Sequence, residues 1–577
     1  MDLLSSLSIA TSSLNAIEYQ YSVTSQNVAN QTTAGYVSET AVVTSAATGS
    51  TANGVQIGKT VLNVSQALQN SLYAQNAQVA AYTATSNSLA SVSAVQGTTA
   101  TDSTTDSAGT TATLSDQLGN VQSALTSLVS TPLESSAQSA VIGDAQSLVD
   151  TIHTLSSTYT TQRQQAQDNV TSSLSDINSD LTQIGVLSQQ IVKLQSVGSD
   201  TADLENQRLG LMTSLSSELS VTFTQTPNGD MIVKTANGVQ LPTRPDQIGQ
   251  SDSSQTLPSS TWPLSLSDSS FTSSEISAST YYAANDSGST IPGIMLNGKD
   301  ITTSLTGGTL GANITLRDDT YPKMQAQLDS FSYTLINRFN SAGLSLFTND
   351  ASSTDASEVT NYLTDVQNGV TASGAYSGSA SPTTTTSVDS TTGAVTVTTT
   401  PPSGIVGLSS LLGVNAIYSG TPSLLTMSTT DSTTGTTTAA TSVADATKTG
   451  DTSVLTNVLG TALGTATSNV SGSLAAPTNN LGPTGTLSTG YTGTEGLLQL
   501  STSLTSDQGA TIAAASSSLT SSSSFQTILQ TQVSNVSGVN VNDEMAKVVA
   551  LQNAYTANAK IVSAVQSMFT SLLDAIQ

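Results

Sequence analysis

Hydrophobic positions near the start of the chain repeat in a heptad. From residue 3 to residue 28, apolar or small residues recur at alternating spacings of four and three. This spacing predicts a helix whose apolar stripe packs along another helix. The same mean spacing returns near the other end, from residue 548 to residue 576. We therefore expect the two terminal helices to pack together, with the rest of the chain forming a long excursion between them.

Most apolar stripes of this kind belong to the core of a single chain. Here they occupy both chain ends, where polypeptides usually fray, and this placement favours contacts between subunits. We assign the following stripe residues to subunit assembly: Leu3, Leu7, Leu14, Ile17, Tyr21 and Val28 in the first helix, and Val562, Val565, Phe569, Leu572 and Ile576 in the last.

The interior of the chain alternates between helical and β patterns. Hydrophobic periodicity predicts helices at 60–96, at 116–131 before Pro132, at 135–196, at 317–340 and from 496 onwards, the last with an interruption at Gly538. A pattern as long as 135–196 suggests a coiled hairpin or a rod. Alternating residues on either side of "PNGD" predict a β-hairpin near 221–233, and Asn297-Gly298 predicts a second.

Residues 350–485 form a tract rich in Thr, Ser and Gly, for which we expect an outer domain with partial β structure. The predicted fold class is mainly α, with terminal helices forming a coiled coil, a long helical bundle and inserted β-rich outer domains. The expected domains are a terminal coiled coil (1–60 and 530–577), a helical rod (61–219, 317–345 and 496–529), a β-rich domain (220–316) and a variable outer domain (350–485).

The net charge of the chain disfavours some classes of binding partner. The 577 residues include 39 acidic and 13 basic ones, a net charge of −26, although charged residues make up only 9% of the chain. Such a chain repels nucleic acid and anionic membranes. No apolar run reaches the roughly 18 residues of a membrane span, and we expect no secretory signal peptide because "MDLLSSLSIATSS" lacks a basic region. The chain has no cysteine, which excludes disulfides and thiolate metal sites.

The sequence offers few candidates for catalytic, nucleotide-binding or metal-binding residues. Gly293–Asp300, "GIMLNGKD", matches a phosphate-binding loop except at its last position, where Asp300 replaces the Ser or Thr that holds magnesium. The Asn-Gly pair instead favours a hairpin there. The single histidine, His153, lies within the predicted helix 135–196, where packing or solvation explains it. We expect no catalytic residue, no cofactor and no metal.

The stretch Asn27–Tyr36, "NVANQTTAGY", follows the first heptad helix and contains no charge. We interpret it as a corner at which the chain leaves the terminal coil. Asn30 is suited to end the helix and Gly35 to adopt dihedral angles closed to other residues. Tyr36 offers an apolar ring with a polar tip for a contact. We therefore add Asn30, Gly35 and Tyr36 to the residues assigned to subunit assembly.

This stretch resembles the signature of the flagellar rod, hook and hook-associated axial proteins, with the pattern falling on Asn27, Ala29, Asn30, Thr33, Gly35 and Tyr36. The C-terminal segment from "SNVSGVNVNDEM" to "SLLDAI" is similar to the matching end of that family. Internal stretches, such as "DLENQRLGLMTSLSSELSVTFTQTPNGD" and "GGTLGANITLRDD", resemble the hook-associated members at the junction of hook and filament. The sequence departs from the family at "GYVSET", which lacks a nearby basic residue, and at Asn542, where an acidic residue is usual.

The resemblance implies a structural subunit that is exported unfolded by the flagellar type III route and polymerises head-to-tail in a helical array. Its implied partners are further copies of itself, the hook protein, a second junction protein and an export chaperone. The chaperone would cover Val562, Val565, Phe569 and Leu572 before export. The resemblance implies neither nucleic acid nor membrane as a partner.

Two alternatives remain. The first is a hook or distal-rod subunit of the same family. The second, from another class, is a secreted acidic adhesin or enzyme that uses the Thr-rich tract. We expect residues 355–480 to be dispensable for assembly, because the resemblance does not extend to them.

Overall fold

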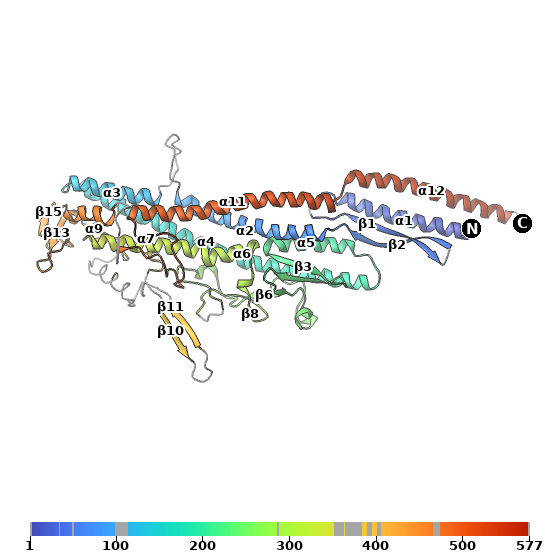
Figure 1. Ribbon diagram of the computed structural model, residues 1–577, viewed down its shortest axis with the longest axis horizontal. Helices are drawn as coiled ribbons and strands as arrows, with labels where there is room; N and C mark the ends of the chain where they lie inside the picture. Colours follow the sequence, from blue (N-terminus) through green and yellow to red (C-terminus); the bar gives the residue numbers. More distant parts are fainter. Residues whose placement is uncertain are drawn as a thin grey trace.

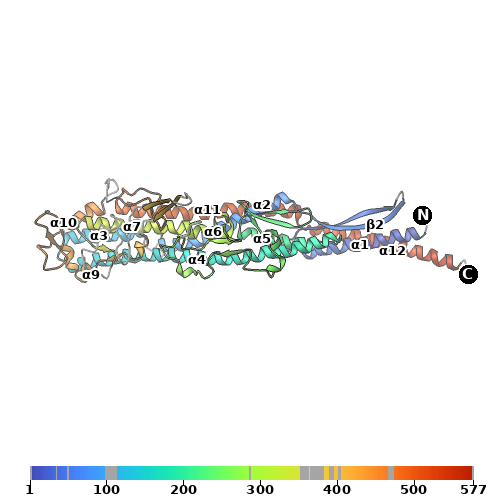
Figure 2. The same cartoon turned by 90° about the horizontal axis from the view of Figure 1, so that it is seen from below.

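The computed structural model describes residues 3–33, 35–48, 51–97, 113–284, 288–350, 363, 383–388, 395–400, 405–464 and 474–574. The molecule is a long rod of nearly parallel helices, and both termini lie at the same end (Figures 1 and 2). Helix α1 (Leu3–Ala29) is the first element of the fold, and α11 (Leu497–Ser537) and α12 (Val541–Asp574) are the last two. The other long helices are α2 (Gln66–Gln96), α3 (Leu114–Ser130), α4 (Ser135–Ser196), α5 (Ala202–Glu218) and α7 (Tyr321–Ser341).

Helix α4 is the spine of the rod. Its 62 residues form one unbroken helix, about 93 Å long at the usual rise per residue. The pattern at 135–196 therefore belongs to a single rod rather than to a coiled hairpin. Its buried positions, such as Val141, Leu148, Ile177 and Ile191, extend along its length and pack against different partners in turn. Helices α3 and α7 lie at the distal half, α11 extends from the distal half to the terminal module, and α2, α5 and the short α6 (Gly308–Thr315) lie nearer the termini (Figure 1).

The terminal helices pair, which confirms the predicted coiled coil. Helix α12 runs antiparallel to α1 (Figure 1). A groove of 910 Å³ separates part of the pair and is lined by Ile17 and Tyr21 from α1 and by Leu551 and Tyr555 from α12. The chain thus begins and finishes in one module, as the two heptads predicted.

A long β-hairpin completes the terminal module, and the assignment of all of 1–60 to a coiled coil was wrong. Strands β1 (Glu39–Thr48) and β2 (Thr51–Leu62) pair antiparallel along α1. Their many Thr and Val residues favour the extended conformation. Gly54, with a φ of +110°, brings the hairpin close to α1, where the Val55 amide donates to Ser12 Oγ at 3.2 Å. Because the strands occupy this region, α2 begins only at Gln66.

The rod also carries several small antiparallel sheets. Strands β3 (Val221–Gln225), β4 (Met231–Thr235) and β5 (Gln240–Leu241) form one sheet, and β6 (Leu264–Leu266), β7 (Ile294–Leu296) and β8 (Lys299–Asp300) form another. Both predicted hairpins are confirmed, and Asn297 and Gly298 adopt the positive φ that a tight hairpin turn needs. Short pairings link β9 (Phe347–Thr348) to β12 (Gly413–Val414), and β10 (Thr383–Val388) to β11 (Val395–Thr400).

The Thr-rich tract is not a separate outer domain over residues 405–464. These residues form β12, α9 (Ala416–Gly420), a sheet of β13 (Met427–Thr430), β14 (Thr437–Ala439) and β15 (Lys448–Thr449), and α10 (Ser453–Asn457). Side chains such as Leu408, Tyr418 and Leu455 are buried in one core with α3, α4, α7 and α11. Removing 355–480 would expose that core, so the structure leads us to expect that the deletion destabilises the rod, and the dispensability of this segment for assembly stays an untested prediction. The rest of 350–485 is mostly outside the described residues.

Arginines join the non-helical segments to the rod. Arg338, which is 1% exposed, donates to the carbonyls of Leu474, Gly493 and Glu495. Arg163 donates to the carbonyls of Ser277, Thr280 and Arg317. Burial lowers the pKa of the Arg338 guanidinium to about 10, so it remains charged at neutral pH. Each arginine therefore satisfies several loop carbonyls that would otherwise be buried without partners.

One buried carboxylate attaches the Thr-rich tract to the rod by accepting hydrogen bonds from its backbone. Asp329 on α7 is 2% exposed and accepts hydrogen bonds from the amides of Gly407 (2.6 Å) and Ser409 (2.9 Å). It also accepts from the Ser409 hydroxyl and from Gln325. Burial raises the pKa of Asp329 to about 6, although these hydrogen bonds oppose the rise. The surroundings consist of donors, and this explains why an acidic residue occupies the position.

Replacing Asp329 with Asn should destabilise the rod by about 2–4 kcal/mol, because the amide group presents donors to donors and leaves buried N–H groups unpaired. Urea unfolding monitored by circular dichroism measures the change. The matched control is Asp150→Asn on the exposed surface of α4, which should change stability by less than about 0.5 kcal/mol. Equal effects of the two substitutions would contradict the anchoring role.

Candidate assembly surface at the chain termini

Asn27 organises the corner that follows α1. Its side chain is 1% exposed. The Asn27 amide nitrogen donates to the Glu39 carbonyl at 2.8 Å, and the Asn27 side-chain oxygen accepts from the Glu39 backbone amide at 2.9 Å. The two bonds mimic a β-ladder pair and fix the start of β1 against the last turn of α1. Sequence reasoning placed Asn27 in the motif but did not identify this role, which needs knowledge of the hairpin.

The other residues of the motif shape the turn. Tyr36 donates its hydroxyl to Asn27 Oδ1 at 3.1 Å, and burial raises the pKa of the phenol above its ordinary value, so it stays protonated. Gly35 has a φ of +79° and is exposed. Asn30 follows the end of α1 and accepts from the Thr33 hydroxyl and amide. The predicted corner is confirmed, and its internal bonds account for much of the motif without a neighbouring subunit.

Several hydrogen bonds attach the corner to the rod. Asn206 on α5 bonds both the amide and the carbonyl of Val37 and also the carboxylate of Glu39. The Ser38 amide donates to the carbonyl of Ser537 at 2.7 Å, at the end of α11. Burial raises the pKa of Glu39, and the nearby carboxylates of Asp203 and others act in the same direction, against the Asn206 bond. The corner therefore connects α1, β1, α5 and α11 at one point.

The β-hairpin is attached to the rod through Asp200, which follows α4. Its carboxylate accepts from the backbone amide and hydroxyl of Thr60 on β2 and from the Tyr19 hydroxyl on α1. Burial acts to raise the pKa of Asp200, but hydrogen bonds from Thr60 and from the backbone amides of Thr201 and Ala202 together lower it below its ordinary value. The hairpin is thus held between α1 and the rod, so that the terminal module keeps one orientation.

Helix α12 carries apolar residues that its own chain leaves uncovered. Val565 is buried against α1, and Val562 and Phe569 are half-buried, so these three occupy the seam. Leu572 is 56% exposed, since α12 extends past the start of α1 (Figure 2). Further residues on α12 are at least 42% exposed: Met545, Val549, Tyr555, Ile561, Met568 and Leu573. A single chain therefore covers only one side of this helix.

The predicted assembly residues of α1 are divided in the same way. Ile17 is buried, Leu7, Leu14 and Val28 are half-buried, and Tyr21 is 42% exposed. Leu3 begins α1, but its side chain lies outside the described part of the structure, as does Ile576. Contacts with α12 and the β-hairpin thus account for much of the α1 stripe. The exposed apolar residues of α12 outside the predicted stripe were missed, because a heptad predicts only one seam.

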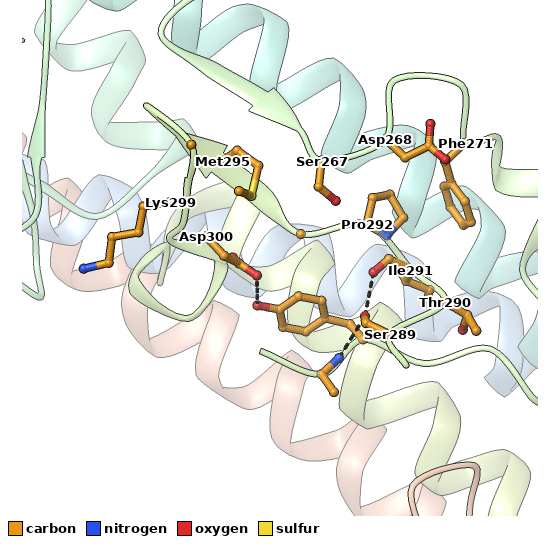
Figure 3. Close-up of a pocket in the computed structure, with 14 residues that line it drawn as sticks. Ser267, Asp268, Phe271, Ser289, Thr290, Ile291, Pro292, Met295, Lys299 and Asp300 are labelled. Atoms are coloured by element: carbon orange, nitrogen blue, oxygen red, sulfur yellow. Dashed lines mark hydrogen bonds between the residues drawn. The ribbon is translucent and has the colours of Figure 1, made fainter. Parts of the chain in front are cut away.

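A second hollow, of 520 Å³, lies over β6, β7 and β8 (Figure 3). It contains the segment that was compared with a phosphate-binding loop. Asp300 points toward the hollow and accepts from the Tyr282 hydroxyl at 3.0 Å and from Thr302. A carboxylate at this position repels phosphate, and the hairpin replaces the helix such a loop needs. Among the described residues, no cluster of three or more His, Asp or Glu is placed to hold a metal, and no helix is apolar enough over sufficient length to cross a membrane.

Replacing Asn27 with Ala should loosen the corner. Two backbone groups of Glu39 and the Tyr36 hydroxyl would lose their partner, at a cost of about 1–3 kcal/mol. We expect faster hydrogen exchange at the Glu39 amide and throughout β1, measured by mass spectrometry on the full chain. Asn30→Ala, which changes an amide on the outer side of the same turn, is the control and should leave β1 unchanged. Unaltered exchange in Asn27→Ala would exclude the anchoring role.

Comparison with known proteins identifies both the rod and the C-terminal segment. Residues 98–349 match the family model of the helical domain of flagellar hook-associated protein FlgK. Residues 530–575 match the C-terminal model of the flagellar basal body rod FlgEFG proteins. Flagellar hook-associated protein 1 of Escherichia coli K12 is 26% identical over 239 residues, which are 40% of this chain and 42% of that protein. The Salmonella typhimurium protein of the same name is 26% identical over 40% of this chain and 41% of its own length.

The match thus spans less than half the length of these curated relatives. The flagellar hook junction protein FlgK from Burkholderia pseudomallei overlaps 81% of this chain and 99% of its own, with 17% identity and a TM-score of 0.46. Both family models describe flagellar axial proteins, and they match the middle of the chain and its C-terminal end. The chain therefore belongs to the flagellar axial proteins and carries the helical domain of the hook-associated protein FlgK.

Proposed function

We propose that this chain is a structural subunit of the bacterial flagellum that joins the hook to the filament. The observation that carries the proposal is the α1–α12 module, in which seven large apolar residues of α12 remain at least 42% exposed. Exposed apolar surface of this extent is costly in a free chain and marks a site of association. In a helical array, each copy would cover this side of its neighbour through heterologous contacts.

The partners follow from the same proposal. Further copies of the chain, the hook protein and a second junction protein would contact the terminal module. Export through the flagellar type III route would precede assembly, and the absence of cysteine suits a chain that must be threaded unfolded. The proposal includes no catalytic residue and no cofactor.

A chaperone near the C-terminus would shield α12 before export. Val562, Val565, Phe569 and Leu572 are the residues we propose for this contact. Val565 is buried against α1 in the folded chain, whereas Leu572 is exposed. In the unfolded chain before export all four are accessible, and an apolar helix without a cover favours aggregation. One surface would then serve a chaperone first and neighbouring subunits afterwards.

The double variant Phe569→Ala, Leu572→Ala tests this surface. It should bind the chaperone more weakly and join hook to filament less often, because each side chain contributes about 2–5 kcal/mol when fully buried. The melting temperature of the isolated chain should change little, since Leu572 is exposed and Phe569 half-buried. Isothermal titration with the chaperone and electron microscopy of flagella provide the two measurements.

The control is Ser571→Ala with Thr570→Ala, two exposed hydroxyl residues on the same helix. This variant should retain both chaperone binding and assembly. A lower melting temperature with unchanged chaperone affinity in the Phe569, Leu572 variant would instead identify the stripe as ordinary intramolecular core.

A hook or distal-rod subunit is the second candidate, favoured by the match of residues 530–575 to basal body rod proteins. The match of residues 98–349 to the FlgK helical domain favours the junction. Electron microscopy of a strain lacking the gene separates the two. Hooks without filaments are the expected result for a junction protein, while the loss of hooks would indicate a hook or rod subunit. Normal flagella on this strain would exclude both and favour a secreted adhesin.

A further inference from the structure

One edge of the rod carries no formal charge. Helix α2 contains none in its 31 residues, and α11 contains none from residue 508 to residue 537. The two helices lie side by side (Figure 1). Gln75 donates to the Ser522 carbonyl at 2.9 Å, and Gln526 donates to Asn76 at 2.8 Å. We call the exposed side of 66–96 and 508–537 the neutral edge. An edge of this length is unexpected on a chain with a net charge of −26.

The neutral edge is also partly apolar. Phe525 is 51% exposed, Ile528 is 52% exposed and Val536 is 56% exposed. Phe525 and Ile528 are three positions apart, so they lie on the same face of α11. Tyr82 on α2 is exposed as well. Covering these apolar side chains with another surface removes them from water, and this lowers the free energy.

Hydroxyl groups on the neutral edge are already satisfied by their own helix. Between residues 520 and 531 of α11, five hydroxyls donate to the carbonyl four residues earlier: Thr520, Ser521, Ser524, Thr527 and Thr531. A hydroxyl with an internal partner loses less on leaving water than an unpaired one. The many Ser and Thr residues of α11 therefore do not prevent the edge from being covered.

The rest of the rod differs in charge. Helix α4 exposes Asp150, Asp168 and Asp176, and α5 exposes Asp203. Arg163, Arg208, Arg317 and Arg338 are at most 4% exposed, so they do not offset these carboxylates at the surface. The surface outside the neutral edge is consequently more anionic than the composition alone suggests. Two copies brought together through such surfaces would repel each other.

We propose that the neutral edge is the lateral contact between the rods of neighbouring copies. The inference rests on the proposed function, because it requires that copies assemble side by side. It adds which side of the rod faces a neighbour and which side faces solvent. A second copy is the occupant that the charges favour, since an anionic chain can approach itself closely only through a face without net charge. A basic partner would instead select the carboxylates of α4 and α5.

Photo-crosslinking in assembled flagella of the source bacterium tests the contact. Benzoylphenylalanine would replace Phe525 on the neutral edge, Thr154 on the exposed side of α4, or Tyr555 on α12. We expect the Phe525 probe to yield dimers of the chain, identified by mass spectrometry, at a yield at least fivefold above that of the Thr154 probe. The Tyr555 probe reports on assembly through the terminal module independently.

The outcomes separate the two proposals. Cross-links from Tyr555 but none from Phe525, or from Phe525 only to a different protein, would overturn the neutral edge and leave the proposed function standing. Equal yields from Phe525 and Thr154 would also overturn it. The absence of cross-links from both Tyr555 and Phe525 would count against the proposed function itself.

A charge substitution provides a second test. Ile528→Glu adds a carboxylate to the neutral edge at an exposed position, so the isolated chain should keep its melting temperature. We expect at least a threefold loss of chain dimers from the Tyr555 probe, partly restored by high salt because salt screens the repulsion. Ile528→Thr and Thr154→Glu are the controls, and both should behave as the unmodified chain. A loss with Thr154→Glu equal to that with Ile528→Glu would contradict the assignment.

Discussion

The antiparallel pairing of α1 with α12 is the constraint on which the rest of the structure depends. It holds the first and last helices of a 577-residue chain together, so that everything between them leaves and returns at one end of the rod. The corner at Asn27 fixes this geometry, because it bonds the end of α1 to the start of β1. Asn206 and Ser537 then connect the corner to α5 and α11. Loss of the pairing would open the terminal module without opening either core of the rod.

Charged residues are few in this chain, and their positions determine how the loops are attached and which surfaces are neutral. The chain uses arginines inside the rod to satisfy loop carbonyls, and it uses Asp329 to anchor residues 405–410 on α7. The outer surfaces of the helices are covered by Ser and Thr whose hydroxyls bond their own helix, as at Thr151 and Thr154 on α4. Helices α4 and α5 expose carboxylates, as at Asp150, Asp168 and Asp203. This division leaves α2 and α11 as a surface that another anionic chain can approach.

Helical periodicity predicted the terminal pair and the helical pattern at 135–196, although it left a coiled hairpin or a rod open there. The hairpins near residues 221–233 and 294–300 were predicted from alternating residues and from Pro-Asn-Gly or Asn-Gly turns, which are also local signals. The hairpin at 39–62 was missed, since its register depends on Ser12 and Asp200 far along the chain. Residues 405–464 were misassigned for a similar reason. Their composition is that of a linker, but Asp329 and Arg338 bind segments of the tract through contacts that no local pattern reveals. Of the terminal assembly residues, the heptad predicted those that face α1, such as Val565, but not the exposed Met568.

Hydrogen exchange of α12 in the free chain and in assembled flagella tests the central claim most directly. If the uncovered side of α12 is an assembly surface, amides of residues 545–574 should exchange rapidly in the monomer, because one side of the helix lacks partners. The same amides should be protected at least tenfold more strongly in the assembled state, while α4 should change little. Equal protection of α12 in the two states would contradict the account.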